Sequence, residues 1–322
     1  MSGWLSFDAY AEEWRRDGDG DPYFEPAFLA AAAIAQGGEP AAFAHEGVLY
    51  PFLVRPLDDG RCDLTSAYGF GGPWGGAPAD WRAAFRAACA QRGVVSEFVR
   101  FHPVRGNQAI AGDDVRLTHV QDMVVLDVRA DDEELVRRMV PQARNKVRKA
   151  MRAGLAAEPS RDLDRFSAMY SDAMRAVDAD PSYLFSLDYF RALDALGDSL
   201  VMLDAGHAAA LFLRGAGAMH YFLAASTAEG RRTAAANLVI HEAMRLARDG
   251  GLGVLNLGGG LRGGDALHAF KCSFGPGRRP YHVGSAVHDR EAYDRLAAAA
   301  GADPDESFFP AYRRPAAAAA QA

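Results

Sequence analysis

Three short apolar runs, separated by glycine-containing gaps, constrain the fold of this chain more than any other feature. They cover residues 200–203, 208–213 and 219–225, and the gaps between them have the length of hairpin turns. Runs of this length with such gaps are typical of consecutive strands that pair with their neighbours. The pattern therefore predicts an antiparallel sheet built as a three-strand meander.

A helix and a fourth strand follow the meander. Apolar residues recur at helical spacing from 236 to 248, and Asp249-Gly250-Gly251 supplies a stop. Residues 254–257 then form a predicted strand, which makes a βαβ unit with the last meander strand. The glycine triplet 258–260 follows at the end of this strand, where a ligand can approach the backbone. The triplet lacks the spacing of a dinucleotide or phosphate-loop motif, so we interpret it as a backbone-approach turn.

The order of these elements, and the residues that follow them, resemble the Fem-type aminoacyltransferases of the GNAT superfamily. A helix ends in Arg-Asp-Gly-Gly, a strand ends in Asn-Leu-Gly-Gly-Gly, and after a short loop Phe270 and Lys271 are closed by Phe274-Gly275. The likeness spans most of the chain, and its specific part is the Phe-Lys segment. Members of this family use aminoacyl-tRNA to extend peptidoglycan cross-bridges, and related members add amino acids to small natural products.

The resemblance implies an α/β (α+β) fold with two tandem GNAT-like domains, each a mixed, mostly antiparallel sheet flanked by helices. The length of 322 residues also favours two domains. We expect the first domain at 1–116, completed by 285–314, and the second at 117–284, where a strand over 117–127 opens it. We expect the alanine-rich tail, 315–322, to be disordered.

Composition indicates an ordinary globular protein of the cytoplasm. Apolar residues make up 49% of the chain, and the three cysteines are odd in number and far apart, which argues against a disulfide framework. No Cys/His cluster has zinc spacing, so we expect no metal site. The N-terminus lacks an apolar signal core, and the apolar run 28–35 is too short to cross a bilayer. We expect a cytoplasmic monomer that does not insert into a membrane.

A net charge of −7 argues against a general nucleic-acid-binding protein, so binding to tRNA would need a local basic patch. The best candidate is a helix expected over 141–154, which resembles the basic helix between the domains of the Fem family. At 100° per residue, one side of it carries Arg144, Arg148, Lys149 and Arg152, and the other carries Ala143, Val147, Ala150 and Met151. The alternative is a solvated amphipathic surface helix. The family resemblance favours phosphate binding, on tRNA or on a nucleotide-linked acceptor.

The resemblance places the reaction at the Phe-Lys segment. Lys271 is implied to face the reacting ester, where a fixed ammonium would stabilise the oxyanion of the tetrahedral intermediate. The backbone around Phe270 is expected to help hold the acceptor, and Asp265 to orient the loop that carries Lys271. No general base stands out. The titratable residues weighed for that role are Asp265, His220, His241 and Glu242, and a lone residue of this kind is more often structural.

Residues of the first domain are expected to bind the acceptor amine. The stretch 66–73, which includes Tyr68 and Gly71, resembles the first-domain glycine-rich turn of the family. Tyr68 and Trp74 are expected to line the acceptor pocket, although aromatic residues beside glycines are also common packing residues. In the run Arg100-Phe101-His102-Pro103, His102 stands where many family members carry an acid. This departure makes a peptidoglycan precursor less certain and favours natural-product tailoring.

Two other functions remain open. The first is an acyl-CoA-dependent GNAT N-acyltransferase, in which a basic glycine-containing loop would bind pyrophosphate before the crossover helix. The corresponding segment, 229–236, keeps Arg231 but has Ala234 and Ala236 where glycines would be needed, and their methyl groups would crowd the ligand. The second is a non-catalytic GNAT-fold binding protein, which the retention of Lys271 disfavours. On the aminoacyl-tRNA reading we expect no cofactor.

Overall fold

The computed structural model describes residues 2–261 and 264–314, so the expected disordered tail lies outside the described residues. The chain divides into two compact units. Unit 1 comprises residues up to 17, 36–120 and those from 281, and unit 2 comprises 18–35 and 121–280. This division differs from the expected boundaries in its placement of 18–35, which belongs to unit 2.

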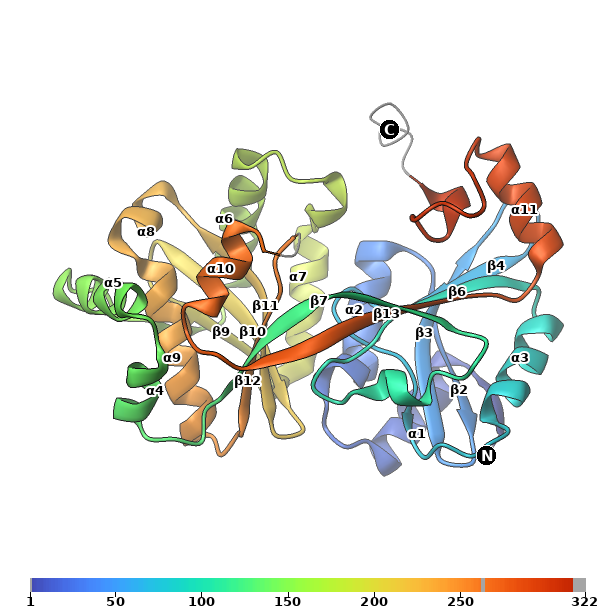
Figure 1. The fold of residues 1–322 in the computed structure, drawn as a ribbon, viewed down its shortest axis with the longest axis horizontal. Helices are drawn as coiled ribbons and strands as arrows, with labels where there is room; N and C mark the ends of the chain where they lie inside the picture. The colour runs from blue at the N-terminus through green and yellow to red at the C-terminus, as the bar shows by residue number, and fades with distance from the viewer. Residues whose placement is uncertain (1, 262–263, 315–322) are drawn as a thin grey trace. The chain divides into compact units, whose positions relative to one another are not determined.

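Unit 2 contains the predicted meander. Strands β9 (Leu200–Asp204), β10 (Ala208–Gly215) and β11 (Ala218–Ser226) pair antiparallel in sequence order. Helix α9 (Ala235–Asp249) leads to β12 (Val254–Gly258), which pairs parallel with β11, so the predicted βαβ unit is confirmed. Figure 1 shows α9 packed along the strands of the meander.

The sheet of unit 2 has the order β7-β12-β11-β10-β9-β8, where β7 is Arg116–Asp127 and β8 is Glu158–Ser160. β7 pairs antiparallel with β12. The core between this sheet and its helices is formed by apolar residues such as Leu126, Phe212 and Ile240. The remaining helices of the unit are α2 (Pro26–Gln36), α4 (Asp132–Arg138), α5 (Pro141–Arg152), α6 (Leu163–Ala176), α7 (Leu187–Leu193), α8 (Ala228–Thr233) and α10 (Ala266–Cys272).

In unit 1 the strand order is β1-β2-β3-β4-β6-β13, with β5 paired to β3. Its strands are β1 (Ser2–Leu5), β2 (Glu39–His45), β3 (Val48–Pro56), β4 (Cys62–Thr65), β5 (Trp74–Gly75), β6 (Val94–Arg100) and β13 (Arg278–Val287). Its helices are α1 (Phe7–Asp17), α3 (Trp81–Gln91) and α11 (Arg290–Ala299). Phe43 and Phe52 of the strands and Phe85 of α3 are fully or almost fully buried in its core. Each unit is thus an α/β body with a mixed sheet, as predicted.

Two strands carry the chain from one unit to the other. β7 begins in unit 1 and continues into unit 2, and β13 begins in unit 2 and continues into unit 1, where it pairs antiparallel with β6. Unit 1 is therefore built from both ends of the described chain. Among the described residues, we find no helix with the length and apolar character needed to cross a membrane.

Candidate functional site

The ends of β11 and β12 define the centre of the site in unit 2. The parallel pairing of these strands covers three residue pairs and ends at His220 and Asn256, although both strands continue beyond it. Parallel strands that stop pairing leave a gap at their carboxyl ends, which is where ligands of α/β sheets bind. Tyr221 is the first residue of β11 past this point, and the turn 258–260 follows β12.

The glycine turn is held by side chains on both sides. Gly258 has φ +74°, a backbone conformation that favours glycine. A Cβ at Gly259 would lie 2.4 Å from Cδ of Gln121, and one at Gly260 would lie 2.1 Å from Oδ1 of Asp265. The Gln121 amide both donates to the Gly260 carbonyl and accepts from the Gly260 N–H, each at 3.0 Å. The groups that approach this backbone are Gln121 and Asp265, and the predicted approach of a ligand stays a prediction.

Lys271 lies on a short helix, α10, and not on the loop that the sequence suggested. Asp265 caps this helix, since its Oδ1 accepts from the His268 N–H at 2.7 Å. Its Oδ2 accepts from the Leu261 N–H at 2.7 Å, so one carboxylate joins the glycine turn to the helix. Seven helical residues are too few to show a clear apolar period, which is why the helix was missed. The orienting role expected of Asp265 takes the form of an N-cap.

The ammonium group of Lys271 is held in a dry, partly polar environment. The residue is 7% exposed, its Nζ donates to the Gly259 carbonyl at 2.7 Å, and the same atom lies 5.3 Å from the ring centroid of Tyr221. Burial lowers the pKa of Lys271 to about 8, and the Asp265 carboxylate partly opposes this shift. At pH 7 the group is protonated by about ten to one. The site can therefore present a fixed positive charge with low hydration.

Phe270 and two of the candidate bases, His220 and His241, have side chains that are packed inside unit 2. Phe270 packs edge-on against Phe274, with ring centroids 5.4 Å apart, and borders the core of unit 2. His220 is buried, and its Nδ1 lies 3.2 Å from the Asn256 amide nitrogen. Side chains alternate along a strand, so His220 points to the opposite face of β11 from Tyr221. Burial lowers the pKa of His241.

The predicted basic helix is α5, and it lies within unit 2. Ala143, Val147 and Ala150 are buried as expected, whereas Met151 is 47% exposed, so its assignment to the packing side was wrong. Arg144 is half-buried and donates to the carbonyls of Arg137 and Met139 at 3.0 and 2.9 Å, near the end of α4. Arg144 therefore has a structural role in joining α5 to α4.

The other three cations of α5 are exposed. Lys149 Nζ donates to the Arg232 carbonyl of α8 at 2.6 Å, and Arg152 Nε donates to the Arg148 carbonyl at 3.3 Å. Arg148 and Arg152 lie one turn apart on the same side of the helix. Arg148, Lys149 and Arg152 therefore lie on the solvent-facing side of α5.

In unit 1, the segment that follows β4 meets the end of β6. The Gly71 N–H donates to the Arg100 carbonyl at 2.7 Å, and the Arg100 guanidinium lies 3.3 Å from the Ser66 carbonyl. Tyr68 is half-buried and its N–H donates to the Gln36 side chain. Gly71 and Arg100 are therefore brought together as the sequence suggested, at the carboxyl ends of two parallel strands.

Trp74 and His102 lie close to the same segment. Trp74 is half-buried in β5, with the guanidinium carbon of Arg105 5.7 Å from its ring centroid. His102 is 1% exposed, and its Nδ1 accepts from the Arg105 N–H at 3.2 Å. Burial, with a contribution from Arg105, lowers the pKa of His102 to about 3. A neutral imidazole thus stands where the family resemblance leads one to expect an acid.

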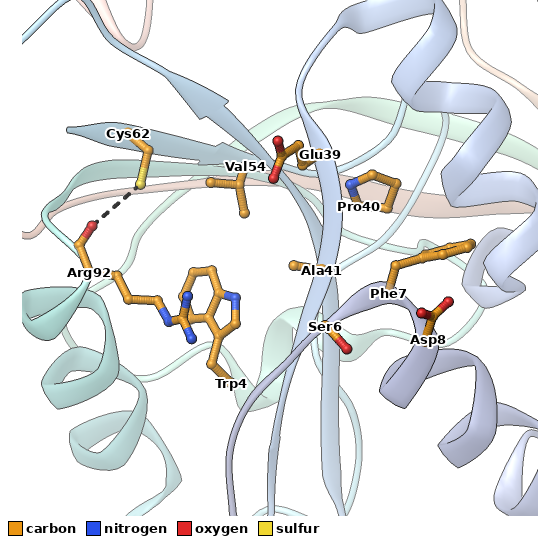
Figure 2. Close-up of a pocket in the computed structure, with 10 residues that line it drawn as sticks. All are labelled: Trp4, Ser6, Phe7, Asp8, Glu39, Pro40, Ala41, Val54, Cys62 and Arg92. Carbon is orange, nitrogen blue, oxygen red and sulfur yellow. Dashed lines mark hydrogen bonds between the residues drawn. The ribbon is translucent and has the colours of Figure 1, made fainter. Parts of the chain in front are cut away.

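A separate cavity of about 550 Å³ lies elsewhere in unit 1. Figure 2 shows Trp4 and Arg92 on one side of it and Phe7 and Asp8 on the other, and the Arg92 guanidinium carbon lies 4.8 Å from the Trp4 ring centroid. It adjoins the amino-terminal ends of β2 and β4, and none of the residues predicted to bind substrate lines it.

Sequence reasoning missed two residues of the site. Gln121 holds the glycine turn, and Tyr221 provides the ring beneath the Lys271 ammonium. Neither belongs to a motif, and both are far from Lys271 along the chain. Tyr221 falls within a predicted strand, but its face toward Lys271 depends on how α10 returns over the sheet.

Comparison with known proteins supports a fold assignment. No family model matches the chain, and no curated protein matches it in sequence. Among solved structures, FemX matches with a TM-score of 0.61 at 14% identity, over 90% of this chain and 97% of that one. L-PGS from Bacillus licheniformis matches with a TM-score of 0.58 at 13% identity, over 89% and 93% of the two chains. The C-terminal domain of a putative lysylphosphatidylglycerol synthetase from Agrobacterium fabrum matches with a TM-score of 0.53 at 16% identity, over 84% and 91%.

Proposed function

We propose that this chain, which has a Fem-like fold of the GNAT superfamily, transfers an aminoacyl group from aminoacyl-tRNA to an amine. The product is an amide, and the acceptor is a small molecule or a peptidoglycan precursor. The ester of aminoacyl-tRNA is already activated, so the reaction uses neither ATP nor a metal. What the protein supplies is positioning and electrostatic stabilisation.

The reaction balances with no further reactant. The neutral amine attacks the ester carbonyl, a C–N bond forms, and the carbonyl oxygen becomes an oxyanion. When the intermediate collapses, the C–O bond to the tRNA ribose breaks, and the proton lost by the attacking amine goes to the ribose oxygen. We assign to Lys271 the stabilisation of the oxyanion. The observation that carries this proposal is its buried ammonium beside Tyr221 and the Gly259 carbonyl, at the end of the β11–β12 pair.

The exposed cations of α5 are proposed to contact tRNA phosphates. We expect Arg148→Glu with Arg152→Glu to weaken the binding of charged tRNA by about tenfold or more at low salt, and to reduce the slope of log affinity against log salt. Filter binding across a salt series measures both quantities. Arg144 is left intact because its hydrogen bonds join α5 to α4.

Lys146→Glu is the control for Arg148→Glu and Arg152→Glu made singly, since it makes the same change in charge as each of them at an exposed position on another side of α5. Equal weakening by the control would indicate a general charge effect. An unchanged affinity in the double variant would support the solvated-helix alternative.

The acyl-CoA alternative is disfavoured by the segment before α9. Residues 228–233 form a short helix, α8, capped by Thr227, and Ala234 has φ +61°. Gly230 is packed so closely that a Cβ would lie 2.2 Å from the His207 carbonyl oxygen. A helical, closely packed segment is a poor substitute for an open glycine loop that cradles pyrophosphate.

Thermal shift with charged tRNA, uncharged tRNA and acetyl-CoA tests the proposal, because a ligand that binds the native state raises its apparent stability. We expect charged tRNA to give the largest shift, and radiolabelled amino acid to move from tRNA to an added amine. A shift with acetyl-CoA alone would replace the proposal with an ordinary GNAT acyltransferase. Binding of tRNA with no transfer to any amine of a broad panel would favour the non-catalytic alternative.

The pH dependence of turnover reports on Lys271. We expect kcat to fall as the pH rises through about 8, because the ammonium then loses its proton. Asp265 raises the pKa of Lys271, so Asp265→Asn, which keeps an N-capping oxygen, should move this limb to lower pH. Steady-state rates from pH 6 to 9.5 measure the limb in both proteins. An identical limb in the variant would contradict the assignment.

We propose that the acceptor amine binds unit 1 beside Tyr68, Gly71, Trp74 and Arg100. With a neutral His102, this region lacks the negative charge that an acid would bring to the same place. An acceptor whose binding requires a negatively charged protein residue at this place would therefore bind weakly. This favours an amine-bearing small molecule in natural-product biosynthesis over a peptidoglycan precursor, and competition between such acceptors in the transfer assay distinguishes them.

A further inference from the structure

A buried imidazole meets two carboxylates in unit 1, far from the Lys271 site along the chain. His45 is 7% exposed at the end of β2, Glu46 is exposed in the turn that follows, and Asp80 is exposed just before α3. One ligand atom from each of the three residues lies within 4.8 Å of the other two. The Nε2 of His45 lies 3.2 Å from Oδ1 of Asp80.

The imidazole is oriented from behind by a hydroxyl group. Nδ1 of His45 lies 2.6 Å from Oγ of Ser2, and the ring stacks on Phe43 with an interplanar angle of 13°. A histidine whose Nδ1–H donates to an oxygen presents the lone pair of Nε2 to the other side. This is the arrangement by which metal-binding histidines are commonly fixed. It leaves Nε2 directed at the Asp80 carboxylate.

Asp80 gives further reason to look for a ligand. It stands at the N-cap of α3, a position that favours aspartate, yet its side chain makes no capping hydrogen bond. Its carboxylate lies beside His45 instead. A contact of 3.2 Å is long for a hydrogen bond to a carboxylate. It is close to the separation of about 3.4 Å between two ligands at 2.0–2.2 Å from one tetrahedral ion.

We propose that His45, Glu46 and Asp80 bind a divalent transition-metal ion, of which Zn²⁺ is the reference case. One imidazole nitrogen with two carboxylates suits Zn²⁺ and its neighbours in the first row, whereas Ca²⁺ and Mg²⁺ prefer oxygen ligands alone. Glu46 is exposed and closes the site by a side-chain rotation. Three protein ligands leave at least one position for water.

The expected consequence is structural. The ion joins the β2–β3 turn to the start of α3, and so stabilises unit 1. The inference does not depend on the proposed transferase function. The sequence spacing hides the site, because 33 residues lie between Glu46 and Asp80 and only the packing of α3 on the sheet brings them together.

Isothermal titration of the apo protein with Zn²⁺ tests the site. We expect one strong site per chain, a rise in the melting temperature of the full-length protein, and little response to Ca²⁺ or Mg²⁺ at equal concentration. Substituted Co²⁺ should give the visible absorption of a four-coordinate site. His45→Gln, and separately Asp80→Asn, should weaken binding at least tenfold. Asp80→Asn changes only an exposed side chain, so it remains informative if His45→Gln fails to fold.

His207→Gln is the matched control, since His207 is an exposed histidine of unit 2. It should leave Zn²⁺ binding unchanged. Wild-type affinity in Asp80→Asn and Glu46→Gln would overturn the proposal, as would a stabilisation by Zn²⁺ that the His207 variant loses.

Discussion

Lys271→Met is expected to lower turnover in the aminoacyl-transfer reaction by about 10²- to 10³-fold, the usual effect of removing one oxyanion-stabilising group. Methionine keeps the length of the side chain and removes the ammonium, so positioning by α10 is retained. The Michaelis constant for charged tRNA should change little, because the lost interaction forms in the transition state. Steady-state kinetics at pH 7 measure both quantities.

The same variant should be at least as stable as the wild type. The pKa of Lys271 falls from 10.5 to about 8 on burial. At pH 7 the buried ammonium therefore lowers the free energy of unfolding. That cost, at most about 3 kcal/mol, is present below pH 8 and disappears between pH 8 and 10.5 as the group loses its proton. Loss of the hydrogen bond to Gly259 offsets about 1 kcal/mol of the gain.

Lys146→Met provides the control, because this lysine is exposed on α5. It should leave turnover and melting temperature unchanged. Normal turnover in Lys271→Met would remove Lys271 from the mechanism. Lost turnover with a large fall in melting temperature would instead indicate a structural role.

Arg82→Met is expected to destabilise unit 1 by about 3–5 kcal/mol. The reason is that it removes the guanidinium that pairs with the buried carboxylate of Glu97. The Arg82 guanidinium lies 2.9 Å from Glu97 and 2.8 Å from Asp114, and Glu97 is 1% exposed. The remaining partner of Glu97 is His288, whose Nε2 lies 2.9 Å away. Urea unfolding at pH 7 measures the loss.

Arg82→Met combined with Glu97→Met is the informative companion, since it removes the buried charge together with its partner. We expect it to recover most of the lost stability. Burial alone would raise the pKa of Glu97, but Arg82 and His288 more than offset this, so the pKa is lowered. Its contribution is therefore complete above the unfolded value of about 4.5 and is lost as the pH falls below it. Equal stability of wild type and Arg82→Met at pH 7 would contradict this account.

The elements with a clear apolar period were predictable from the sequence. The meander, α9, β12 and α5 were predicted because their apolar residues repeat over several turns or strands. β1 shows where such patterns fail, because nothing in the sequence of Ser2–Leu5 marks it as a strand, although Trp4 pairs with Phe43 of β2. A strand of four residues has no period to detect, and its place is set by β2.

The site was predictable only where residues are adjacent in sequence. Phe270, Lys271 and the glycine turn belong to one segment, so the family resemblance found them together. Gln121 comes from β7, 139 residues before the Gly260 backbone that it holds. Met151 was misplaced because helical angle alone does not say how wide the buried face of α5 is. Tertiary packing decides these cases.

The passage of the chain through β7 and β13 sets an order for folding during synthesis. When residue 280 has left the ribosome, all of unit 2 is present, whereas β6 of unit 1 still lacks its neighbour β13. Unit 2 can thus fold at this stage. Unit 1, although its synthesis began first, still has an unpaired strand edge at β6. The edge of β6 is therefore exposed to aggregation from its own synthesis until β13 emerges.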